Sequence, residues 1–162
     1  MSDTLIAIAA IAVVLVPIIG GFAAWFAPAS SAGRIAALGS VLAVVGSVGM
    51  SVPALAGVTV TGLGGLVIVD AWSALVILVI DVVGAAALLG SPAYLDHAIS
   101  SGALRDRDRA RYWALMLWFF GGLLAVPITA NLGLVWVGIE ATTVVSALLV
   151  GITRTPAAIE AA

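Results

Sequence analysis

The sequence predicts an all-α integral membrane protein, built as one bundle of five transmembrane helices. The first observation behind this fold class is composition, since 64% of the 162 residues are hydrophobic and 9% are charged. Soluble domains carry about 25% charged residues. The second observation is a series of long apolar stretches, and the third is the placement of the basic residues between them.

Each apolar stretch is long enough to cross a bilayer, because about 20 residues that rise roughly 1.5 Å each span the hydrocarbon layer. The five stretches are Leu5–Phe26, Ile35–Val52, Ala71–Gly90, Tyr112–Ala130 and Leu132–Thr153. We expect one domain over residues 1–162. A further helix begins within residues 156–162, with Thr155 as its N-cap and proline at its first position. That segment is too short to be stable alone, so we expect a partial domain or one completed by another polypeptide.

The segment Pro53–Asp70 between the second and third stretches has a different pattern. Residues 58–61 and 66–69 are rich in valine, isoleucine and threonine, and they flank the glycines at positions 62, 64 and 65. This pattern predicts a small β-hairpin. Because an open strand edge cannot face lipid, we expect the hairpin outside the membrane or against protein.

All six basic residues are arginines, and their positions predict the topology. Arg34 follows the first stretch, four arginines lie between 105 and 111, and Arg154 follows the fifth stretch. If five helices alternate in direction, all six arginines lie on one side of the membrane. The positive-inside rule makes that side cytoplasmic and places the N-terminus outside.

Composition also argues against several kinds of site. Cysteine is absent and His97 is the single histidine, so we expect no metal site and no cofactor bound by this chain. The net charge of −2 gives no reason to expect nucleic-acid binding. We interpret His97 as a surface residue of the cytoplasmic loop rather than as a proton gate.

Glu140 lies in the middle of the fifth stretch and is the first candidate functional residue. A carboxylate at membrane depth costs about 2.5 kcal/mol or more, so such groups commonly handle protons or ions. Thr143 lies on the same helical face three residues later. We predict proton transfer at Glu140 with Thr143 beside it; the alternative is a protonated glutamate that hydrogen-bonds another helix.

Asp81 is the second acid at membrane depth. It lies ten residues after the start of the third stretch, and Glu140 lies eight residues after the start of the fifth. The two carboxyl groups could therefore line one hydrated layer and take part in proton transfer together. The alternative is a neutral aspartic acid held in a hydrogen bond between helices.

Several motifs carry a family resemblance. The segments 70–75 (DAWSAL) and 91–95 (SPAYL) resemble the motifs that open and close the third helix of the antiporter-like subunits of respiratory complex I. The segment 131–143 (NLGLVWVGIEATT) is similar to the glutamate-bearing helix of the same family, and 146–151 and 155–162 continue the match. The amino-acid sequence around Glu140 most resembles that of membrane-bound, energy-converting hydrogenases.

The resemblance covers the N-terminal third of a family member. It implies a proton-translocating subunit of a multi-pass complex in a prokaryotic inner membrane, with other membrane subunits as partners. It also implies that Glu140 acts with a lysine from a later helix. The chain would hold no redox chemistry itself but would belong to an oxidoreductase complex of the NADH–quinone or hydrogenase type. The alternatives are a subunit of a multisubunit sodium/proton antiporter and a non-conducting structural bundle.

Overall fold

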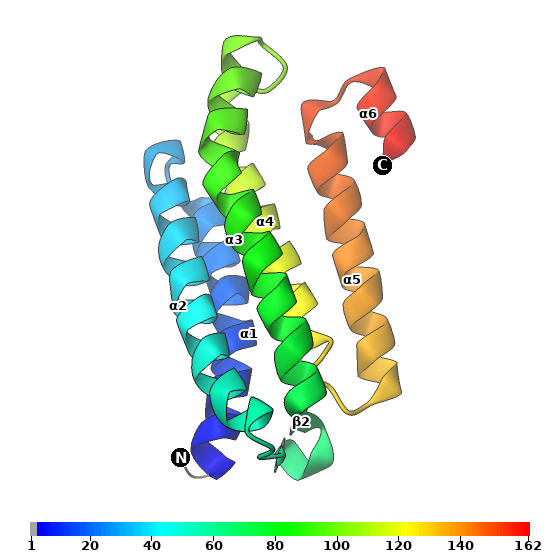
Figure 1. Cartoon of the computed structure of the whole chain (residues 1–162). Coiled ribbons are helices and arrows are strands. Elements are labelled where there is room, and N and C mark those ends of the chain that lie inside the picture. The colour runs from blue at the N-terminus through cyan, green and yellow to red at the C-terminus, as the bar shows by residue number, and fades with distance from the viewer. Residues whose placement is uncertain (1–2) are drawn as a thin grey trace.

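A computed structural model describes residues 3–162 of the chain, 82% of which is helical. Figure 1 shows long helices that run roughly parallel to one another, with a small β-hairpin at one end. In chain order the elements are α1 (Asp3–Phe26), α2 (Ala29–Leu55), β1 (Val60–Gly62), η1 (Leu63–Gly65), β2 (Val67–Val69), α3 (Ala71–Ser100), η2 (Asp106–Asp108), α4 (Arg109–Ala125), α5 (Leu132–Val150), η3 (Gly151–Thr153) and α6 (Pro156–Ala161).

Four helical segments are long and apolar enough to cross a membrane by length and composition. They are Leu5–Phe26, Ala29–Leu55, Ala71–Ser100 and Leu132–Thr153. The protein is therefore a multi-pass membrane protein. Helix α4 has 17 residues, slightly fewer than the roughly 20 that a span requires, so a fifth span stays a prediction.

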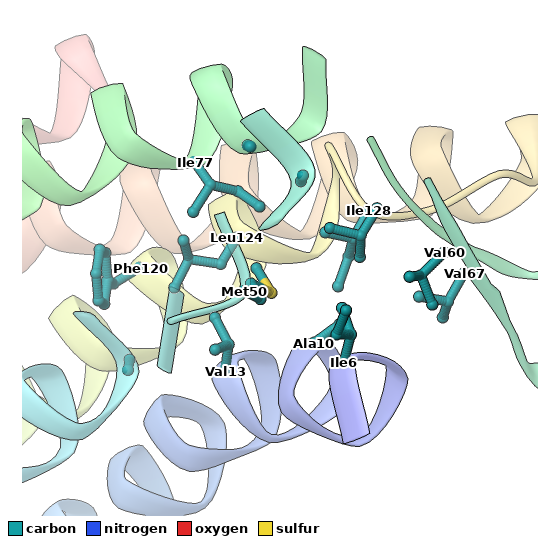
Figure 2. Close-up of a cluster of buried hydrophobic side chains, with 14 residues drawn as sticks. Ile6, Ala10, Val13, Met50, Val60, Val67, Ile77, Phe120, Leu124 and Ile128 are labelled. Atoms are coloured by element: carbon teal, nitrogen blue, oxygen red, sulfur yellow. The ribbon is translucent and has the colours of Figure 1, made fainter. Parts of the chain in front are cut away.

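The packed part of the molecule is formed by α1 to α4. Helix α1 lies against both α2 and α4, and α3 packs mainly against α2. Figure 2 shows the core between them, where Val13 of α1, Met50 of α2, Ile77 of α3 and Leu124 of α4 point toward one another. Small residues permit this close approach: a Cβ atom added at Gly46 would lie 2.8 Å from Cγ2 of Val13.

Helices α2 and α3 are longer than the sequence predicted. Helix α2 begins at Ala29 rather than at residue 35, so Arg34 lies on the helix instead of in a loop. Helix α3 continues through Pro92 to Ser100 rather than ending at residue 90, which places His97 on a helix. The turn after α3 contains Gly102, whose φ of +76° favours glycine, and the N–H of Leu104 closes this turn on the carbonyl of Ala98.

Helix α4 ends at Ala125, five residues before the predicted end at residue 130. Its last predicted residues instead pair with β2, since the N–H of Ile68 donates to the carbonyl of Ile128 and the N–H of Ala130 donates to that of Leu66, both at 2.9 Å. Strand β1 pairs antiparallel with β2 on its other side. The position of the β-hairpin, outside the membrane or against protein, stays a prediction.

Candidate functional site

Asp81 is enclosed between α2 and α3, and its side chain is 4% exposed. Its Oδ2 atom is hydrogen-bonded to the hydroxyl of Ser47 on α2. The Ser47 hydroxyl also lies 3.0 Å from the carbonyl oxygen of Val44 in its own helix. Within the part of the chain that the structure describes, Oδ1 of Asp81 and the buried hydroxyl of Ser51 have no hydrogen-bond partner.

The hydrogen bond between Asp81 and Ser47 connects two helices. A serine hydroxyl has one proton, so Ser47 can donate it to Val44 or to Asp81, but not to both. When Ser47 donates to Val44, the bond to Asp81 requires a protonated carboxyl that donates to Ser47. In either case the hydrogen bond joins α2 to α3 across an apolar interface, where a buried polar group without a partner is costly.

Glu140 has the opposite surroundings, because it lies on an exposed face of α5. The buried face of α5 carries Thr142, and a Cβ atom added at Gly122 of α4 would lie 2.7 Å from its Cγ2 atom. Residues that are two positions apart in an α-helix, such as Glu140 and Thr142, point in directions about 200° apart around the helix axis. Glu140 therefore points away from α4, and it is exposed within the part of the chain that the structure describes.

Thr143 is also exposed, and its hydroxyl donates to the carbonyl of Ile139 at 2.9 Å. The hydroxyl is thus held close to its own helix, one turn from Glu140. It retains an acceptor lone pair, so it can still receive a hydrogen bond from water or from a neighbouring group.

The structure does not bring Asp81 and Glu140 together. Helix α5 packs mainly against α4, whereas Asp81 faces α2, and Figure 1 shows α5 beside the four-helix bundle. The sequence analysis did not identify the hydrogen bond between Ser47 and Asp81. The available signal was a serine at membrane depth in a neighbouring helix. Thr142, rather than Thr143, proved to be the buried threonine.

The arginines gather at one end of the molecule, at the start of α2, before and at the start of α4, and after η3 (Figure 1). Buried Asp108 lies 3.0 Å from Nη1 of Arg111 and 3.7 Å from Nη2 of Arg154, which ties the start of α4 to the end of α5. Arg109 pairs with Asp96 at 2.9 Å and with Asp106 at 3.3 Å. The hydrogen bond to Asp96 is the main cause that raises the pKa of Arg109.

Residues that could hold a metal ion do not cluster in the described part of the chain. No group of three or more histidine, aspartate or glutamate side chains lies close enough together to hold a metal ion among these residues.

A comparison with known proteins finds a similarity to a hydrogenase component. Over 98 residues it is 32% identical to a "Hydrogenase-4 component F homolog" of Methylacidiphilum infernorum (isolate V4). The match covers 60% of this chain and 21% of the relative, so the chain spans about a fifth of the length of the curated relative that it matches. No protein-family model and no solved structure matches the chain.

Proposed function

We propose that this chain forms part of a proton-translocating membrane subunit of a hydrogenase or complex-I-like assembly. The observation that carries the proposal is the similarity to the hydrogenase-4 component F homolog. The multi-pass helical structure supports it, since proton translocation requires spanning helices. The partners would be further membrane subunits of the same assembly.

In this proposal Glu140 is the proton-transfer group. An acid at membrane depth on an uncovered helix face requires a partner, because burial against lipid leaves its charge unsatisfied. The partner would be a cation supplied by another segment or subunit that covers this face of α5. Such a cation favours the carboxylate form, and its movement would release or recapture the proton. Thr143 would orient water beside the carboxyl group.

Replacement of Glu140 in the intact assembly tests this role. Glu140→Gln keeps the size of the side chain but removes its titration, so we expect proton translocation in proteoliposomes to fall by at least about tenfold. The chain has one other glutamate, Glu160 of α6, which gives a matched control. Translocation per turnover at the wild-type level in Glu140→Gln would sink the proton-transfer role and favour a structural bundle.

The proposed topology has the N-terminus outside and the arginine-rich end in the cytoplasm of a prokaryotic cell. It rests on the six arginines that flank the helices at one end of the chain's bundle. Reporters fused at Ser2 and Gly102 test it. We expect activity of a periplasmic reporter at Ser2 and of a cytoplasmic reporter at Gly102, and the reverse pattern would show the opposite orientation.

A further inference from the structure

A groove of about 820 Å³ runs along the outer side of α2 and α3, starting from the arginine end. Its walls are apolar over most of their length, formed by Val41 and Val45 of α2 and by Ala85 and Leu89 of α3. Val41, Val45 and Leu89 are 59%, 65% and 82% exposed, so the groove opens to the surroundings of the bundle.

The mouth of the groove carries two arginines. Arg34 and Arg109 line it together with Asp106. Arg109 is already paired with Asp96 and Asp106. Arg34 is exposed, and among the side chains that the structure describes no carboxylate lies within ion-pair distance of it. Arg34 is therefore the cation at the end of the apolar groove that has no acidic partner among the described residues.

The length of the groove indicates what can fill it. Along α2 it extends from Ala29 to Val45, about 24 Å, and the part that lies inward of Arg34 is eleven residues, or about 16 Å, long. One leaflet of the hydrocarbon layer is about 15 Å thick, half of about 30 Å. A spanning helix from another protein would need a groove over the full thickness. An acyl chain whose headgroup lies at the arginines fills one leaflet.

We propose that this groove binds one anionic phospholipid from the leaflet at the arginine end. Its phosphate accepts hydrogen bonds from the guanidinium of Arg34, and one acyl chain lies along Val41 and Leu89. An arginine at the membrane surface attracts anionic headgroups, and its planar donors fit a phosphate. A headgroup with a net charge of −1, such as that of phosphatidylglycerol, balances the charge that Arg34 leaves at the mouth.

Photocrosslinking tests the site directly in membranes that contain the chain in its assembly. The probes are phosphatidylglycerol and phosphatidylcholine, each with a diazirine near the end of one acyl chain, and crosslinked peptides are mapped by mass spectrometry. We expect phosphatidylglycerol to label the groove segments of α2 and α3 about fivefold more than phosphatidylcholine, the ratio expected for one basic residue near the surface.

Two pairs of variants separate the site from general effects. Arg34→Gln should remove the preference for phosphatidylglycerol, whereas Arg107→Gln, which removes the same charge outside the groove, should keep it. Ala37→Phe, which fills the groove, should lower labelling by both lipids, whereas Ala86→Phe outside it should not.

Three results would overturn the proposal. The first is equal labelling by the two lipids in the wild-type protein. The second is an equal loss of preference in Arg34→Gln and Arg107→Gln. The third is an absence of lipid labelling together with crosslinks from a partner subunit into the groove, which would show a protein segment in place of the lipid.

Discussion

Asp81 and Glu140 both carry carboxyl groups in long apolar helices, but they differ in burial and in hydrogen bonding. Asp81 is buried between α2 and α3 with the hydroxyl of Ser47 as its partner, whereas Glu140 lies on the face of α5 that points away from α4. The helices that carry the two acids differ in the same sense: 22% of the most apolar stretch of α3 is buried inside the chain, against 6% for that of α5.

The two acids differ in the hydrogen-bond partners that the described part of the chain supplies to them. A buried polar group stabilises a fold when it is hydrogen-bonded and destabilises it when it is not. Asp81 has one partner within the bundle, the hydroxyl of Ser47 at Oδ2, whereas its Oδ1 has none among the described residues. Glu140 has none among the described side chains, and its role depends on whatever covers α5. The comparison therefore separates an acid that is held between two helices from one that is exposed on its helix.

Removal of Ser47's hydroxyl gives the largest expected effect. Ser47→Ala leaves the buried carboxyl of Asp81 without its hydrogen bond, so we expect the free energy of unfolding to fall by about 1–3 kcal/mol. Thr143→Ala beside Glu140 removes an exposed hydroxyl and should change it by less than about 0.5 kcal/mol. Unfolding in mixed detergent micelles measures both, and equal effects would contradict the comparison.

The attachment of α5 can be tested at a single glycine. A Cβ atom at Gly122 would lie 2.7 Å from Cγ2 of Thr142, so Gly122→Ala should loosen the contact between α4 and α5 and destabilise the protein by about 1–2 kcal/mol. Gly49 has no atom within 4 Å of an added Cβ, so Gly49→Ala should be neutral or slightly stabilising. The same unfolding measurement distinguishes them, and a neutral Gly122→Ala would show that α5 moves freely.

Asp70 provides a reference for an acid at a helix end. Its side chain accepts a hydrogen bond from the N–H of Ser73 at 2.8 Å, which lowers the pKa of Asp70. Asp70→Ala should therefore cost about 1 kcal/mol at neutral pH. Because the pKa is lowered in the folded state, this contribution is present above about pH 4 and is lost as the pH falls further. The free energy of unfolding of the wild-type protein and of Asp70→Ala, measured between pH 3 and pH 7, tests this. A difference that does not depend on pH would contradict the role of the Asp70 carboxylate.

The starts of three helices could be predicted from the sequence because their signals are local. Asp70, Asn131 and Thr155 each accept a hydrogen bond from an N–H three residues later, and the helices begin directly after them. The end of α4 could not be predicted, since residues 128–130 leave the helix to pair with β2, a contact with a distant segment. The direction in which Asp81 and Glu140 point could not be predicted either, because it depends on which helices lie beside α3 and α5.

The smallest expected effect is that of Asp81→Asn on proton translocation. The two interpretations of Asp81 make opposite predictions here. If Asp81 shared a hydrated layer with Glu140, loss of its charge would shift the pH dependence of translocation, because a neighbouring charge changes the pKa of a carboxyl group. If Asp81 holds α2 to α3, asparagine can keep the hydrogen bond to Ser47 and the pH profile should not change.

The position of Asp81 favours the second outcome, since its carboxyl group faces α2 while α5 packs on α4. The measurement is the rate of proton translocation against pH in proteoliposomes of the intact assembly, with Ser47→Ala as a companion variant that weakens the same bond. A shift of about one pH unit in Asp81→Asn would correspond to about 1.4 kcal/mol of interaction between titrating groups. That result would show that Asp81 interacts electrostatically with a titrating group on the path of the proton, and it would contradict a purely structural role for Asp81.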